Sequence, residues 1–148
     1  MRELQAKQKF LQDDLKKKVP GLANILGANE YVYYCHYGPT YFQAVTEKRF
    51  LINAREDRGL RGFGGWVLQE APWGEVVAAG DLQNKSNFMG DRWTEFEIQT
   101  FKGPIVCKND WRAAARLHQE AKHALGLHNA GARDIRAVIF ALNSEAAN

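Results

Sequence analysis

Five cations near the middle of the sequence are candidates for binding an anion: Lys48, Arg49, Arg55, Arg58 and Arg61. The last three recur at every third position, in a stretch that also holds four glycines. Guanidinium groups can make forked hydrogen bonds to phosphate or carboxylate, and glycine lets a ligand approach the backbone closely. These residues therefore offer a site for an anion or a lipid headgroup. The alternative is a solvated loop, because Glu56 and Asp57 offset part of the charge.

Two cysteines and four histidines are the other groups that could do chemistry. Cys35 and His36 are adjacent, and neighbours in a strand point to opposite faces, so they are poorly placed to hydrogen bond to each other. His118, His123 and His128 are spaced by five, about 140° apart around a helix. A zinc-binding helix typically uses a spacing of four. We therefore expect no metal and no cofactor.

The catalytic alternative is a small hydrolase that pairs Cys107 or Cys35 with a histidine distant in the sequence. No phosphate-binding loop, nucleophile elbow or dinucleotide fingerprint occurs in the chain. Two inert, buried thiols would leave the hydrolase without support. We expect the protein not to be an enzyme.

The composition is that of one ordinary globular domain. The chain has 148 residues, 45% of them hydrophobic, and a formal net charge of +3. Nucleic-acid-binding domains are usually more basic, so nucleic acid is an alternative partner and not the expected one. No signal-peptide pattern begins the sequence, and no apolar run approaches the ~20 residues of a membrane-spanning helix. We expect a cytoplasmic protein with reduced cysteines.

The N-terminal region is predicted to be helical, over residues 2–18 and again, briefly, over residues 22–26. One stripe of the first helix carries Leu4, Leu11 and Leu15. Isolated helices of this length are marginal in water. We therefore expect this stripe to dock on the body of the protein or on a second copy of it.

Residues 30–109 have the pattern of about seven short antiparallel strands separated by turn residues. In residues 41–53, YFQAVTEKRFLIN, two apolar arms flank Thr46-Glu47-Lys48-Arg49, which predicts a hairpin with Glu47-Lys48 as a two-residue turn. The Arg/Gly stretch and DLQNKSN are expected to be loops. Tyr31, Tyr33 and Tyr37 would line one face of the first strand if it is unbroken, as a candidate interface. The default role of the four tryptophans is the core.

A C-terminal helix is predicted to start after Asn109 or Asp110 as its N-cap and to end at Gly126. Residues 132–143 are ambiguous. Their apolar residues fit a helical face, whereas VIF also has strand character, and we favour a second helix.

Three segments resemble bacterial PH-like and GRAM-like domains. AVTEKRFLIN resembles a hairpin of that family, APWGEVVAAG the segment that follows it, and FEIQTFKGPIVCKNDWRAAARLHQEAKHAL the last hairpin and C-terminal helix. The resemblance implies an α+β fold: a PH-like antiparallel barrel capped by the C-terminal helix over residues 30–126. The helical extension 1–29 and the helical tail 127–148 are additions to that pattern.

The resemblance implies a non-catalytic binding or assembly module, because PH-like domains as a class bind phosphoinositides, peptides or other proteins. The expected partner is a protein or an anionic membrane surface, and the N-terminal helix is expected to support docking or homo-oligomer formation. The alternatives are nucleic-acid binding through the Arg/Gly stretch and the Cys/His hydrolase.

Overall fold

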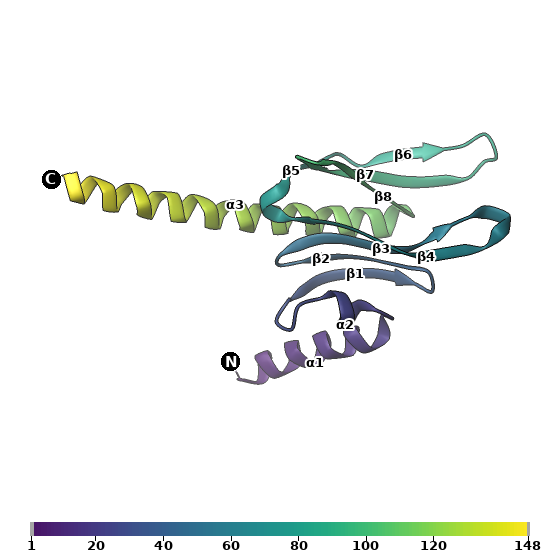
Figure 1. Ribbon diagram of the computed structural model, residues 1–148, viewed down its shortest axis with the longest axis horizontal. Coiled ribbons are helices and arrows are strands. Elements are labelled where there is room, and N and C mark those ends of the chain that lie inside the picture. Colours follow the sequence, from purple (N-terminus) through teal and green to yellow (C-terminus); the bar gives the residue numbers. More distant parts are fainter. Residues whose placement is uncertain (1, 148) are drawn as a thin grey trace.

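The computed structural model describes the backbone of residues 2–147 and the side chains of residues 6, 7 and 9–131. Helices α1 (Arg2–Lys18) and α2 (Leu22–Ile25) come first, and the long helix α3 (Trp111–Ala147) comes last (Figure 1). Eight described strands lie between them: β1 (Val32–Gly38), β2 (Tyr41–Thr46), β3 (Arg49–Asp57), β4 (Phe63–Pro72), β5 (Val76–Ala79), β6 (Gln83–Ser86), β7 (Arg92–Thr100) and β8 (Gly103–Asn109).

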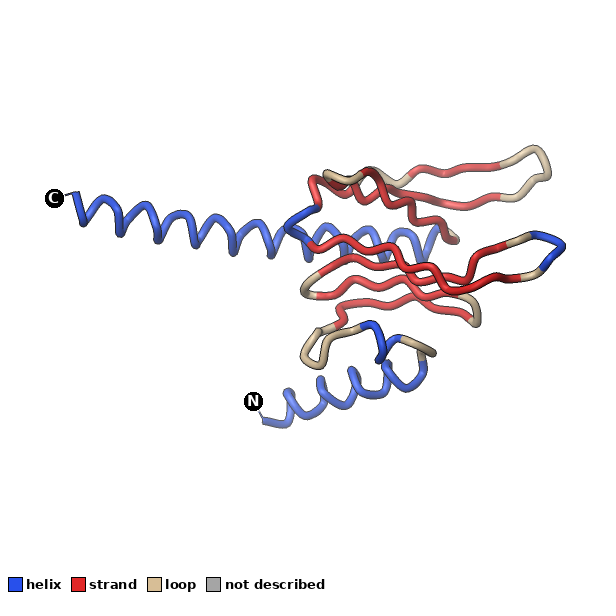
Figure 2. The backbone as a smooth tube through the Cα atoms, viewed as in Figure 1, coloured by secondary structure: helices blue, strands red, loops and turns tan. Residues whose placement is uncertain are grey.

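The strands form two antiparallel sheets (Figure 2). Sheet A has the order β1-β2-β3-β4. In sheet B, β7 pairs with β8 along one side and with β5 and β6 along the other. The first half of α3 lies between the two sheets, and its second half projects beyond them (Figure 1). This confirms the predicted α+β architecture of antiparallel strands with a C-terminal helix.

The core has two parts, one on each face of sheet A. Between the sheets, Phe50, Phe96 and Ile98 pack against the buried face of α3, which includes Leu117. On the opposite face, Leu22 belongs to a second cluster that α2 and the end of α1 place over β1, β2 and β3. Since each face of sheet A is covered, the strands at its centre have continuous apolar runs, as a doubly buried strand requires.

The predicted hairpin between β2 and β3 is confirmed, including its register. Val45 pairs with Phe50, which leaves Thr46 and Arg49 flanking the two-residue turn. No residue of the turn has a positive φ, so it is not the common Asn-Gly type, which needs two. The Thr46 hydroxyl holds the turn instead, because it accepts the backbone N–H groups of Lys48 and Arg49 at 3.1 and 3.0 Å.

Two predicted loops are largely strand. β6 lies within DLQNKSN, so the strand count is eight and not seven. All four β6 side chains are exposed, so the segment lacks the apolar alternation that marks a strand. The Arg/Gly stretch is mostly the ends of β3 and β4, joined by a short turn in which Gly59 and Gly62 take positive φ values of 64° and 82°.

Gly126 does not end the C-terminal helix, contrary to the sequence-based prediction. α3 runs without a break from Trp111 to Ala147, so the predicted helix over residues 132–143 is part of it. Its N-cap is Asp110, whose carboxylate accepts the N–H of Ala113 at 3.0 Å. Among the described residues, no helix is both long enough and apolar enough to span a membrane.

Candidate binding site

The five candidate cations do not form a single cluster. Lys48 and Arg49 lie at the start of β3, whereas Arg55, Arg58 and Arg61 lie at or beyond its far end. At roughly 3.3 Å per strand residue, Arg49 and Arg55 are about 20 Å apart along β3. One small anion cannot contact both groups.

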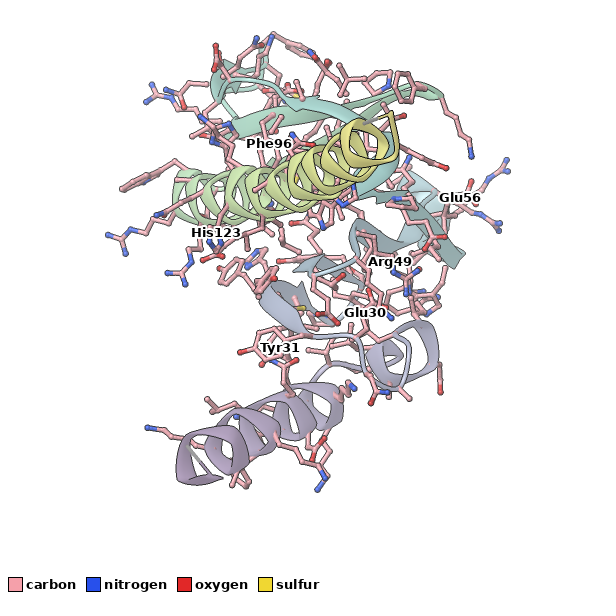
Figure 3. All side chains as sticks on the ribbon, turned by 90° about the vertical axis from the view of Figure 1, so that its left-hand side faces the viewer. Glu30, Tyr31, Arg49, Glu56, Phe96 and His123 are labelled. Carbon is pink, nitrogen blue, oxygen red and sulfur yellow. The ribbon has the colours of Figure 1, made fainter. Side chains whose placement is uncertain are left out.

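Arg49 is part of an internal ion-pair network and not a free cation. Its Nε and one Nη each donate to the Glu30 carboxylate at 3.0 Å, and that Nη also donates to the Ile25 carbonyl at 2.7 Å. The other Nη pairs with Glu70. The side chains of Glu30 and Arg49 are only 3% and 17% exposed. The guanidinium of this candidate cation is therefore engaged inside the protein and does not lie free in solvent (Figure 3).

The pKa of Glu30 is held below its ordinary value by its hydrogen-bond donors. Burial alone would raise this pKa, but the bonds from Arg49, the Thr46 hydroxyl and the Gly27 amide together outweigh burial. Thr46 donates to the carboxylate at 2.6 Å, and Gly27 donates at 3.1 Å. The carboxylate thus ties α2, the hairpin turn and β3 together.

Two of the three arginines on the β3–β4 hairpin also have intramolecular partners. Arg55 donates to the carbonyl oxygens of Gly64 and Phe63 across the hairpin. Arg58 pairs with Glu56 at 3.4 Å. Within the described part of the chain, Arg61 and Lys48 form no ion pair. Leu60 lies fully exposed between Arg58 and Arg61.

The three tyrosines do not share a face, because β1 is irregular between Val32 and Tyr34. Tyr31 and Tyr33 are edge to face at 5.6 Å, and Tyr33 packs against the core beneath α3. Beyond the irregularity, Cys35 packs against the cluster under α1 and α2. By strand alternation, Tyr37 lies on that same opposite face. The expected tyrosine row is therefore split.

The leucine stripe of α1 docks on the body only in part. Leu15 packs against the cluster beneath α2, whereas Leu11 is exposed, and the side chain of Leu4 lies outside the described residues. Gln12 strengthens the docking because its side chain exchanges two 2.9 Å hydrogen bonds with the backbone of Val32. Gln12 could not be singled out from the sequence, since nothing in its local pattern distinguishes it from the other polar residues of the helix.

The two thiols lie in different parts of the core. Cys35 faces the cluster under α1 and α2, and Cys107 lies between the sheets. Burial raises the pKa of each thiol to about 12, so little thiolate exists at neutral pH. His118 is engaged with the Gly80 carbonyl at 2.8 Å. No cluster of three metal-binding side chains occurs among the described residues.

A groove of about 760 Å³ lies between the β6–β7 hairpin and the first turns of α3. Its lining residues come from both elements: Leu82, Asn84, Lys85, Ser86, Arg92, Trp93, Thr94, Asp110, Trp111 and Ala115. None of these belongs to the candidate anion or interface residues predicted from the sequence. The tryptophans were expected in the core, but Trp111 is 64% exposed and Trp93 is only half buried.

The β6–β7 hairpin borders this groove, and β6 has an unpaired outer edge. The Asn87 N–H donates to the Asp91 carbonyl at the end of the hairpin. Bonded pairs alternate along antiparallel strands, so Lys85 also faces β7, whereas the backbone groups of Asn84 and Ser86 point away from it. Among the described strands, only β7 pairs with β6. β6 therefore has a strand edge with free N–H and C=O groups on the side away from β7.

Each aromatic ring at the groove lies beside one cation, and the Trp93 indole N–H also donates to the Glu95 carboxylate at 3.1 Å. Lys108 lies 5.7 Å from the centre of the Trp93 ring, and Arg112 lies 5.6 Å from that of Trp111. Lys85 and Arg92 line the groove and form no ion pair within the described residues. The carboxylate of Asp110 is occupied as the helix cap. The groove thus presents the exposed ring of Trp111, and its lining holds the two cations Lys85 and Arg92 against the one carboxylate of Asp110.

No family model matches the chain, and no curated protein matches it. Among solved structures, it is similar to a pleckstrin homology domain from Shewanella amazonensis SB2B, with 18% identity over 71% of this chain and 96% of that one and a TM-score of 0.47. It is also similar to a DUF1696 family protein with a pleckstrin-homology domain from Shewanella loihica PV-4. That match has 17% identity over 75% of this chain and 92% of the other, with a TM-score of 0.46.

Proposed function

We propose that this chain is a non-catalytic binding module that holds an extended segment of a partner protein in the groove between β6 and α3. The observation that carries the proposal is the unpaired edge of β6 at a groove that also holds the exposed ring of Trp111 and the half-buried Trp93. A peptide that adds to a sheet edge gains main-chain hydrogen bonds without any requirement on its sequence. The side-chain environment then selects among peptides.

The charge of the groove favours an acidic segment with at least one large apolar side chain. Four cations lie at or next to the groove: Lys85, Arg92, Lys108 and Arg112. Trp111 is the side chain we expect to contribute most to affinity, because tryptophan is enriched among the residues that dominate binding energy. Its exposed ring also contributes little to the folded core, so its removal should leave the domain intact.

The test is a selection of peptides from a random phage-displayed library on the full chain, followed by titration of the best peptide. We expect Trp111→Ala to weaken its binding at least tenfold, the effect of losing about 1.4 kcal/mol. Phe101→Ala is the matched control, since Phe101 is also an exposed ring, 81% accessible, in the β7–β8 turn away from the groove. Equal affinities for the two variants would contradict the proposal.

A second variant tests the strand-addition geometry itself. The Ser86 N–H points to the free edge of β6, so Ser86→Pro removes an outward donor while the β6–β7 ladder stays intact. We expect this change to weaken the selected peptide even though the groove keeps both tryptophans. Unchanged binding would show that the peptide is held by side chains of the groove alone and does not add as a strand to β6.

An anionic membrane surface is the second candidate partner, because the fully exposed Leu60 lies between Arg58 and Arg61 at the tip of the β3–β4 hairpin. An apolar tip flanked by cations suits insertion at a headgroup layer. The replacement of Arg55, Arg58 and Arg61 by alanine should abolish binding to phosphatidylserine vesicles at low salt. The absence of vesicle binding by the unmodified chain would end this candidate.

A further inference from the structure

β4 is a long edge strand whose free side is apolar and exposed at Trp66 and Val67, and which from Leu68 to Pro72 borders a pocket of about 430 Å³ shared with β8. It forms one border of sheet A and pairs only with β3 among the described strands. Trp66, Val67 and Leu68 are 45%, 52% and 41% exposed. Natural proteins usually protect such an edge with lysine, proline or a covering element, because an unprotected edge pairs with another strand. From Phe63 to Gln69 the strand carries neither a charge nor a proline.

The register shows which backbone groups of β4 are available. The Trp73 N–H donates to the Lys48 carbonyl at 3.2 Å. Since bonded pairs alternate, Val67 and Gln69 face β3, whereas the N–H and C=O groups of Trp66 and Leu68 face the free edge. Nearer the hairpin tip the Gly64 carbonyl already accepts a hydrogen bond from Arg55. The available edge is therefore centred on Val67.

This edge is complementary to itself in one antiparallel register. If Val67 of one copy lies opposite Val67 of the other, Trp66 lies opposite Leu68 in both directions. Those two pairs supply four main-chain hydrogen bonds, and each brings a tryptophan ring against a leucine on one face of the sheet. Glu70, which has its own partner in Arg49, then lies opposite Gly64, so no like charges face each other.

We propose that two copies of this chain associate through their β4 edges, antiparallel and about a two-fold axis at Val67, to form one continuous eight-stranded sheet. Two-fold pairing is the commonest symmetry of soluble oligomers, and it uses the same patch on both copies. The surface is separate from the groove at β6. The dimer therefore presents two copies of that groove. If the chain does not dimerise, the peptide-binding proposal is unaffected.

Cysteine crosslinking tests the register. In the proposed dimer the two Val67 residues form a non-hydrogen-bonded pair, with Cα atoms about 4.5 Å apart, within disulfide reach. The two Gln69 residues would be roughly 14 Å apart, which is beyond it. Under mild oxidation we expect Val67→Cys to form a covalent dimer and Gln69→Cys not to. Equal crosslinking of the two variants, or none by Val67→Cys, would overturn the proposal.

Light scattering after size exclusion tests the association without a crosslink. The full chain should elute as a dimer at micromolar concentration, and Leu68→Pro, which removes an N–H of the free edge and none of the β3–β4 ladder, should elute as a monomer. Leu68→Thr, which keeps that N–H, is the control and should retain part of the dimer. If the full chain is still a monomer at about 100 μM, the proposal is overturned.

A charge swap at Val67 keeps the proposal testable even if the proline variant is poorly folded. Val67→Lys and Val67→Glu should each be monomeric, because like charges would meet at the two-fold axis. An equimolar mixture of the two should recover a heterodimer. Failure of the mixture to associate, while both variants have the circular dichroism spectrum of the original chain, would show that Val67 does not face its own copy.

Discussion

A single buried carboxylate connects the segments that surround the β2–β3 turn. Glu30 accepts hydrogen bonds from Arg49, Thr46 and Gly27, so it joins the start of β1 to α2 and to the hairpin. Arg49 and Arg61 look alike in the sequence, since each has one large apolar neighbour, Phe50 or Leu60. Their roles differ because Glu30 lies 19 positions away from Arg49, and such a distant pairing leaves no local signal.

Removal of Arg49 should be costly, because it leaves the Glu30 carboxylate buried without its cation. We expect Arg49→Met to lower the free energy of unfolding by about 3 kcal/mol. Adding Glu30→Gln should recover part of this loss, with a coupling of about 1–3 kcal/mol in a double-mutant cycle. Urea denaturation at pH 7 measures all four chains. Additive losses would show that the two side chains do not interact.

The lowered pKa of Glu30 predicts the direction of its pH dependence. The carboxyl has a lower pKa in the folded than in the unfolded chain, whose ordinary value is 4.5. Its contribution is therefore fully present above that value and is lost as the pH falls through the lower folded pKa. The stability difference between the original chain and Glu30→Gln should shrink between pH 5 and about pH 3. A difference that grows on acidification would contradict this assignment.

At the scale of elements, the continuity of α3 through Gly126 has a measurable consequence. Gly126 lies inside the helix, and nothing lies within 4 Å of where a Cβ atom would be. Gly126→Ala should therefore raise the free energy of unfolding by about 0.5–1 kcal/mol. Gly103→Ala is the contrasting control, because Gly103 has a φ of 119° and alanine there would be strained. A destabilising Gly126→Ala would instead favour a helix that ends at this glycine.

The elements that could be predicted from the sequence are those whose pattern is set by local burial. The β2–β3 hairpin was predicted correctly because its arms are apolar on both faces and Thr46 stabilises the turn. β6 was missed because all its side chains are exposed. The prediction of a tyrosine row was wrong because one irregularity after Val32 shifts the alternation of side chains along β1. Such a shift arises from the pairing with β2 and not from the sequence of β1 alone.

The candidate groove was the least predictable feature, because it depends on elements that meet only in the folded chain. Trp111 was expected in the core as the default for a tryptophan, yet it lies at the groove on the first turn of α3 and is mostly exposed. The polar residues of β6 gave no signal of a strand edge. The cations could be identified in the sequence. The sequence did not show that they lie at opposite ends of β3, or that Arg49 forms an internal ion pair.

At the scale of the whole molecule, α3 has two halves with different surroundings. The first half covers the core. Its final contacts with the body, among the described side chains, are made by Ala124, Leu125 and His128. His128 lies beside Gly74. The second half projects past both sheets (Figure 1). We therefore expect the core to need α3 only up to about residue 130.

A chain that ends after residue 130 should keep its fold, with a free energy of unfolding within about 0.5 kcal/mol of the full chain. A chain that ends after residue 120 should not fold, because it lacks Ala121 and Ala124, which are buried between the sheets. Urea denaturation and the circular dichroism spectrum distinguish the two. If the chain that ends after residue 130 instead loses more than about 2 kcal/mol of unfolding free energy, the projecting half of α3 makes contacts that stabilise the folded state. The expectation that this half is not needed by the core would then be wrong. Since the helical signal of the removed segment also disappears, stability and not helix content is the deciding measurement.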